Sequence, residues 1–302
     1  MIAIEPSGQI LGCTLRGLDM SKPLEDRDLG AVVLALAKHG YVRFPDQTLS
    51  TADVKTLSDQ FGEVQMPSNA DDEREVPGVG FLSNMVVDGK PLGKPDAGLM
   101  WHTEMSYNKP FGYVNVLYAV KVPQRDGKAL GPTEFIDGRA AYDDLPDAVK
   151  RRLKGLTATH DVQNYWDAAR DMGSSRPPFT PEHRAAKPLV SHPLAMVHPV
   201  SGRTVLYCNP GFTVRIDGLP EAEGRELLKY LIDHQMQPKY RCAFAWAERD
   251  LLIWDNIGTM HRAVCDYGPD EHRWIKRCQV KATKILDPAF LRRVVHPESV
   301  SS

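Results

Sequence analysis

The sequence predicts an α+β protein, mainly β, in which short strands alternate with a few helices. Two observations support this class. Short runs of apolar and β-branched residues, bounded by Gly and Pro, recur along the chain, and apolar residues at helical spacing are confined to a few stretches. In addition, no internal repeat, low-complexity segment or linker divides the 302 residues. We therefore expect residues 1–302 to form one domain with helical additions.

The first part of the chain predicts a helix, a strand and a second helix. Apolar residues at helical spacing indicate a first helix that ends at Gly40, and a short strand follows over 41–44. Ser50 and Asp53 have the spacing of a capping box, so they predict the start of the second helix, which Gly62 follows. The apolar positions that carry the two patterns are Leu29, Val33 and Leu36, then Val54, Leu57 and Phe61.

The middle of the chain predicts strands and a helical region. Residues 66–78 are polar and contain proline, which is typical of a loop. The elements expected after them are a strand over 99–107, a strand over 113–120, a turn over 127–132, an extended segment over 133–136 and a helical region over 140–156.

The C-terminal half contains one segment with little periodicity, residues 167–187. A segment of this kind is typical of an active-site lid, and a solvated surface excursion explains it equally well. After it, the pattern predicts a helix from Pro220 that stops before Pro238, a buried strand over 251–254 and a last strand over 274–282.

Composition excludes several classes of function. The net charge of −2 has no polyanion-binding signature, so we expect no nucleic-acid partner. The N-terminus lacks the pattern of a secretory signal, and no apolar run has the length of a membrane span. The five cysteines are scattered and odd in number, which favours reduced thiols over a disulfide framework or a zinc site. These features predict a cytoplasmic protein without a membrane partner.

His102 and Glu104 are the most informative pair in the chain. Residues two apart on a strand point to the same face, so an imidazole and a carboxylate can reach one metal ion. With His261 they would form the two-histidine, one-carboxylate face of non-haem Fe(II) oxygenases. The spacing occurs once more, at His296 and Glu298, which we interpret as a surface tail because it lies near the C-terminus. By itself, a strand histidine is more often a core residue than a ligand.

Further motifs make the assignment specific. The segments Trp101-His102-Thr103-Glu104, Trp254-Asp255-Asn256, His261-Arg262-Ala263 and Arg273-x-x-x-Arg277 resemble the taurine/2,4-D dioxygenase family of Fe(II)- and 2-oxoglutarate-dependent oxygenases. So do the segments 198–203 and 209–213, and the similarity extends from about residue 5 to residue 286. The resemblance implies a double-stranded β-helix, or jelly roll, over about 80–286, with helical insertions and N-terminal helices.

The resemblance also implies roles for individual residues. His102, Glu104 and His261 would hold Fe(II), while Arg273 and Thr133 would bind the distal carboxylate of 2-oxoglutarate. Asp255 would fix the turn before the second histidine. The residues expected to border the substrate are Arg277, Phe212, Trp166 and Asn209; for Asn209 and Phe212 packing beneath the pocket is the alternative, and for Trp166 a place in the core. An arginine at position 277 implies a small anionic substrate, and family members are commonly homo-oligomers.

The implied reaction uses O2 and 2-oxoglutarate to hydroxylate a C–H bond, releasing succinate and CO2; at a carbon bearing a heteroatom, bond cleavage can follow. Most family members have aspartate where this chain has Glu104; a retained carboxylate argues against halogenation. Gly98 replaces an asparagine of taurine-specific members, and residues 63–70 lack their His and Tyr, which argues against taurine as the substrate.

Two kinds of alternative function remain. The same scaffold could catalyse desaturation, epoxidation or cyclisation, or the protein could bind 2-oxoglutarate or another small acid without catalysis. A zinc hydrolase is disfavoured because no H-E-x-x-H helix is present.

Overall fold

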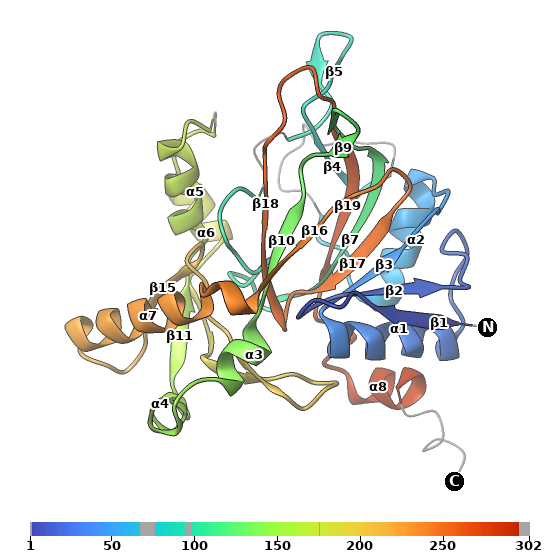
Figure 1. Ribbon diagram of the computed structural model, residues 1–302. Helices are drawn as coiled ribbons and strands as arrows, with labels where there is room; N and C mark the ends of the chain where they lie inside the picture. Colours follow the sequence, from blue (N-terminus) through green and yellow to red (C-terminus); the bar gives the residue numbers. More distant parts are fainter. Residues whose placement is uncertain (1, 67–75, 95–97, 175, 296–302) are drawn as a thin grey trace.

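The structure, a computed structural model, describes residues 2–66, 76–94, 98–174 and 176–295 (Figure 1). Its largest element is a seven-stranded sheet with strand order β1-β2-β3-β17-β7-β19-β4, in which the β2–β3 pair is parallel and the other pairs are antiparallel. Its strands are β1 (Ala3–Pro6), β2 (Cys13–Arg16), β3 (Tyr41–Phe44), β4 (Gly80–Ser83), β7 (Gly112–Lys121), β17 (Leu251–Asp255) and β19 (Trp274–Lys281).

A second, three-stranded sheet packs on one face of the large sheet. It has the order β16-β10-β18, and its strands are β10 (Thr133–Asp137), β16 (Arg241–Phe244) and β18 (Thr259–Ala263). Leu117 and Trp254 of the large sheet join Phe135 and Phe244 of the small sheet in one apolar cluster. The architecture is therefore mixed α/β with a mainly antiparallel sheet, as the sequence predicts at this level.

Helices cover the other face of the large sheet. They are α1 (Asp26–His39), α2 (Thr51–Phe61) and α8 (Pro288–Val294), and Figure 1 shows α1 and α2 beside the strands of the sheet and α8 packed against α1. Their apolar residues pack against alternate residues of the central strands, including Val116 and Val280. The predicted boundaries of the first two helices are confirmed, because α1 ends at Gly40 and Ser50 and Asp53 form the capping box of α2.

The remaining elements form a lobe on the side of the small sheet (Figure 1). Its helices are α3 (Gly138–Asp143), α4 (Asp147–Leu153), α5 (Val162–Asp171), α6 (Pro181–Ala186), α7 (Glu221–Gln235) and the 3-10 turn η2 (Pro238–Tyr240). Its strands are β11 (Thr157–His160), β12 (Val190–Pro193), β13 (Ala195–Val197), β14 (Thr204–Leu206) and β15 (Thr213–Ile216). Two short hairpins complete the chain: β5 (Val86–Val87) with β6 (Lys90–Pro91), and β8 (Gln124–Arg125) with β9 (Lys128–Ala129).

Two predicted elements around the site differ in the structure. The strand predicted over 99–107 is wrong: His102 forms one isolated β-bridge, and the chain turns immediately after it, with Met105 at a φ of 54°. The helical region predicted over 140–156 is two helices, α3 and α4, separated at Leu145 and Pro146. Proline disfavours helical geometry in the residue before it, which explains this break.

One further prediction is partly wrong. The segment 127–132 is not only a turn or loop, since its first residues belong to the β8–β9 hairpin. The segment 167–187 contains the end of α5 and all of α6, two helical pieces that its weak periodicity does not indicate. Most of the predicted loop 66–78 lies outside the described residues, as do His296 and Glu298. Within the described residues, no helix is both long and apolar enough to cross a membrane.

Candidate metal centre

Two distant segments bring His102 and His261 together. Their backbones form an antiparallel bridge, in which each residue donates its N–H to the carbonyl of the other at 3.0 and 2.9 Å. The two imidazole rings then lie with their centroids 4.3 Å apart. A third segment packs closely on this pair, since a Cβ on Gly211 would lie 3.0 Å from the Cβ of His102, which favours glycine at that position. The bridge thus sets the distance between the two histidines.

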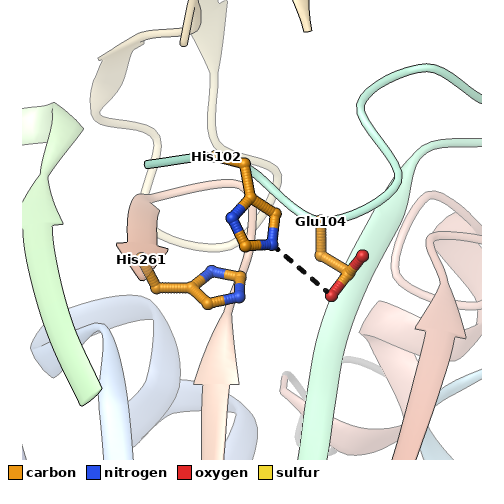
Figure 2. A group of neighbouring side chains, drawn as sticks. All are labelled: His102, Glu104 and His261. Carbon is orange, nitrogen blue, oxygen red and sulfur yellow. Dashed lines mark ion pairs between the residues drawn. The ribbon is translucent and has the colours of Figure 1, made fainter. Parts of the chain in front are cut away.

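Glu104 faces the same point from the turn that follows His102 (Figure 2). Its Oε2 lies 3.9 Å from His102 Nε2, and one nitrogen or oxygen from each of His102, Glu104 and His261 lies within 4.8 Å of the others. The turn packs tightly on β7, since a Cβ on Gly112 would lie 2.5 Å from the Glu104 carbonyl oxygen. Two imidazoles and one carboxylate therefore converge as the sequence predicts, although Glu104 reaches the common point from a turn and not from a strand.

The protonation of these histidines suits a metal ligand. All three side chains are buried, and burial lowers the pKa of His102 and, further, the pKa of His261. Both imidazoles are therefore neutral at pH 7. His102 Nδ1 lies 2.8 Å from the Met100 carbonyl, which can only accept, so Nδ1 carries the proton and Nε2 keeps its lone pair toward the centre.

A chain of hydrogen bonds holds the Glu104 carboxylate. Asn115 on β7 donates to Glu104 Oε2 at 3.0 Å, Asn256 donates to the Asn115 side-chain oxygen at 3.2 Å, and Trp254 donates to Asn256 at 2.9 Å. Arg277 lies 3.7 Å from the same Glu104 oxygen. Sequence reasoning missed Asn115, although a lone amide in an otherwise apolar strand is a signal that could have found it.

Thr133 and Arg273 line an inner cavity that also contains the three candidate ligands. The strand register explains the position of Thr133: Phe135 pairs with His261, so residue 133 faces the same side of the sheet. The Thr133 hydroxyl accepts a hydrogen bond from Trp246 at 3.0 Å. Arg273 is only 5% exposed and forms no ion pair with any carboxylate that the structure describes. This buried guanidinium next to the candidate ligands is suited to hold an anion.

A larger outer cavity of about 250 Å³ opens on the other side of His102 and Glu104. It is lined by Arg277, Phe212 and Trp166, three of the residues expected at the substrate, and by Tyr107 and Tyr165, which sequence reasoning missed. The predicted lid segment reaches the same cavity through Arg176 and Lys187. The two cavities share His102, Glu104 and Arg277, so a molecule in either one lies beside the candidate ligands.

Asn209 does not line either cavity and takes the other position considered for it, packed beneath the pocket. Its side chain is 1% exposed: the amide group donates to Ser106 at 3.2 Å, and its oxygen accepts the Phe212 N–H at 2.8 Å. It therefore supports the turn that follows Glu104. Asp255 has the predicted structural role, because it accepts the backbone N–H groups of Ile257 and Gly258 just before β18.

Several characterised proteins are similar to this chain. The 2,4-dichlorophenoxyacetate dioxygenase of Burkholderia sp. (strain RASC) is 36% identical over a region that covers 60% of each protein. Pentalenolactone F synthase of Streptomyces avermitilis is 28% identical over 97% of this chain and 96% of its own length. Among solved structures, AAD-2 in complex with Mn(II) and N-oxalylglycine has a TM-score of 0.77 at 29% identity, covering 94% of this chain and 98% of that one.

The family profile described as "Taurine catabolism dioxygenase TauD, TfdA family" matches residues 3–279. That range includes both cavities and all three candidate ligands. A taurine dioxygenase of Burkholderia xenovorans also has the same fold, with a TM-score of 0.74 at 25% identity over 95% of this chain and 92% of that one. The chain therefore belongs to the TauD/TfdA family.

Proposed function

We propose that this protein is an Fe(II)- and 2-oxoglutarate-dependent oxygenase that hydroxylates a C–H bond of a small anionic molecule. The observation that carries the proposal is the convergence of two neutral, buried imidazoles and one carboxylate, with their ligand atoms within 4.8 Å of one another. This donor set fits Fe(II) in non-haem oxygenases. With iron bound, the site would couple oxidative decarboxylation of 2-oxoglutarate by O2 to substrate hydroxylation, releasing succinate and CO2.

In this proposal His102, Glu104 and His261 hold the metal ion. The hydrogen bond from His102 to the Met100 carbonyl fixes its tautomer, so that Nε2 is free to bind. Asn115 holds the glutamate, which has one more methylene than the aspartate of most family members and thus more rotational freedom. The chain's own contribution here is to keep three ligands on one side of the ion and to leave the other side accessible.

Arg273 and Thr133 are the residues we propose for 2-oxoglutarate. A carboxylate beside Arg273 would compensate a buried guanidinium that has no described acidic partner, and the Thr133 hydroxyl can donate to the same carboxylate. The inner cavity measures only about 30 Å³. This is far below the volume of a typical ligand pocket, so lining side chains must move when the cosubstrate enters.

The outer cavity is the proposed substrate site. Arg277 supplies a positive charge beside the metal ligands, and Trp166 and Phe212 supply an apolar wall. This combination suits a small molecule with an acidic group on an apolar body. Relatives named for their activity support it, among them a 2,4-dichlorophenoxyacetate dioxygenase and a sulfate ester dioxygenase of Pseudomonas putida.

We also propose that the two facing sheets form a jelly roll and that residues 1–302 are one domain.

The proposal is tested by spectroscopy under anaerobic conditions. Addition of Fe(II) and 2-oxoglutarate to the protein is expected to produce a visible charge-transfer band, and titration with Mn(II) should give one site per chain. His261→Ala is expected to lose both signals. His39→Ala, at the end of α1 and remote from the site, is the matched control and should keep them. Absence of the band in the wild-type protein, or its persistence in His261→Ala, contradicts the proposal.

Mass spectrometry of the product then separates hydroxylation, which adds one oxygen, from desaturation, which removes two hydrogens.

A further inference from the structure

Lys187 lies where two cavities meet. It lines the outer cavity of 250 Å³ beside the candidate metal ligands and also a further cavity of about 510 Å³. The two cavities also share Gln65 and Tyr107. Lys187 directly follows α6, and its backbone N–H is bonded to His183, so the helix holds it in position. A molecule that extends from the 250 Å³ cavity into the 510 Å³ cavity therefore passes this side chain.

The charge of Lys187 is not balanced by the described residues. Its ammonium group donates to Asn108 Oδ1 at 3.1 Å and lies 5.5 Å above the centre of the Tyr107 ring. It forms no ion pair with any described carboxylate, whereas neighbouring Lys281 is paired with Glu63. Burial lowers the pKa of Lys187, and the positive charge of Lys281 lowers it further. A partly buried ammonium in this environment gains most from an anionic ligand.

The other residues that line the 250 Å³ cavity indicate the chemistry of such a ligand. Arg277 lies at the metal-ligand end, 3.7 Å from Glu104. Lys187 lies above the ring of Tyr107, which packs at 4.7 Å on Phe212 of the same wall. The described charges of this lining are basic except for Glu104, which is a proposed metal ligand; besides Arg277 and Lys187 they include Lys94 and Arg176. One acidic group of a substrate is matched by Arg277, and Lys187, which also lines the 510 Å³ cavity, is placed for a second group farther from the metal ligands.

We propose that Lys187 forms a second anion subsite, so that the preferred substrate carries two separated acidic groups on an apolar body. This inference rests on the proposed function, because it assigns the substrate class of the same site. In the bound complex one acidic group, a carboxylate, sulfonate, sulfate or phosphate, faces Arg277 and the other faces Lys187. The C–H bond to be oxidised lies in the part of the molecule nearest His102 and Glu104.

The experiment measures binding by calorimetry to protein saturated with Mn(II) and 2-oxoglutarate. The probes are matched pairs of equal chain length: adipate and hexanoate, suberate and octanoate, sebacate and decanoate. Wild-type protein should bind at least one dianion about tenfold more tightly than its monoanion, as expected for one added charge-assisted contact. Lys187→Met should remove this preference while monoanion binding is unchanged, and Lys187→Arg should keep it.

Lys150 offers a matched control, because it is also half-buried and lies 5.8 Å above a tyrosine ring but does not line either cavity. Lys150→Met should bind all probes as the wild type does. A wild-type protein that shows no dianion preference at any chain length, or a Lys187→Met variant that keeps it, overturns the inference while the proposed function stands. If Mn(II) and 2-oxoglutarate themselves fail to bind, the proposed function fails, and this inference with it.

Discussion

The two faces of the large sheet are made by the same strands but carry different kinds of side chain. On β7, Val114 and Val116 point toward the helices, whereas Asn115 between them points toward the site. On β19, Val280 packs with the helices, whereas Arg277 lines both cavities. Because strand residues alternate between faces, one strand can contribute to the core and to the site at once.

The difference between the faces predicts different consequences of substitution. The helix-covered face buries apolar area, which stabilises the fold. The site face also packs apolar residues against the small sheet, but around the candidate ligands it buries amides and guanidinium groups, whose desolvation is offset only where they are hydrogen-bonded or meet a ligand. Substitutions on the first face should therefore change the free energy of unfolding, and substitutions of the polar residues around the candidate ligands should change ligand binding.

Arg273→Met should have the largest effect on binding. Arg273 is buried without a described acidic partner, so loss of its guanidinium removes the proposed contact with 2-oxoglutarate. We expect the affinity for 2-oxoglutarate to fall about 100-fold or more, with the free energy of unfolding unchanged or higher. Calorimetry and urea unfolding measure the two quantities. Arg262→Met, which removes an ion pair with Glu134 on the adjacent small sheet, is the control; equal 2-oxoglutarate affinity in both variants would contradict the assignment.

Val116→Ala tests the opposite face. Val116 is fully buried against the helices, so the variant should lose about 2 kcal/mol in the free energy of unfolding through lost burial and a small cavity. Urea unfolding measures this loss. Mn(II) affinity should stay at the wild-type value, and a large decrease in that affinity would show that the two faces are not independent.

The free energy of unfolding should depend on pH because of buried histidines near the site, which can take up a proton, whereas apolar residues cannot. Burial, with a contribution from His192, lowers the pKa of His160 from 6.5 to about 3. Below pH 6.5 the unfolded chain takes up a proton that the folded chain does not, so the free energy of unfolding decreases as the pH falls toward 3. From pH 7 to pH 5 this group alone should contribute a loss of about 2 kcal/mol. His160→Gln should show a smaller loss than the wild type by about that amount; equal losses in the two proteins would rule out a low pKa for His160.

Asn115→Leu should have the smallest effect. It removes the hydrogen bond to Glu104 Oε2 and should lower Mn(II) affinity about tenfold, which is typical of residues that orient a metal ligand. Gln279 pairs directly opposite Asn115 in the strand register, and its side chain forms no hydrogen bond with Glu104, so Gln279→Leu is the matched control. Equal Mn(II) affinities in the two variants would mean that Asn115 does not position the glutamate.

The sequence predicts best what local interactions determine. Ser50 and Asp53 mark the start of α2 because both partners of the capping box lie within one turn. The segment around His102 resembles a strand in composition, but among the described residues its strand-like pairing is limited to His261, more than 150 residues away, and no local pattern reports such a contact. α6 is too short for its periodicity to be visible, so Lys187 was found only in the structure.

The sequence predicts those site residues that belong to recognisable motifs. His102, Glu104 and His261 converge as the resemblance implies, and Thr133, Arg273 and Arg277 line the same cavities. Asn209 was proposed as a substrate neighbour because segment 209–213 resembles the family, with packing beneath the pocket as the alternative, and its amide is turned inward to Ser106. Which side of a loop residue faces a cavity depends on tertiary packing, and sequence spacing does not contain that information.

Diffraction from a crystal soaked in Mn(II), recorded at the manganese absorption edge, tests the central claim most directly. The account predicts one strong anomalous peak within bonding distance of Nε2 of His102, a nitrogen of His261 and a carboxylate oxygen of Glu104. It also predicts that the remaining positions around the ion face the two cavities. An anomalous peak elsewhere in the chain, or the same peak in crystals of the His261→Ala variant, would contradict it.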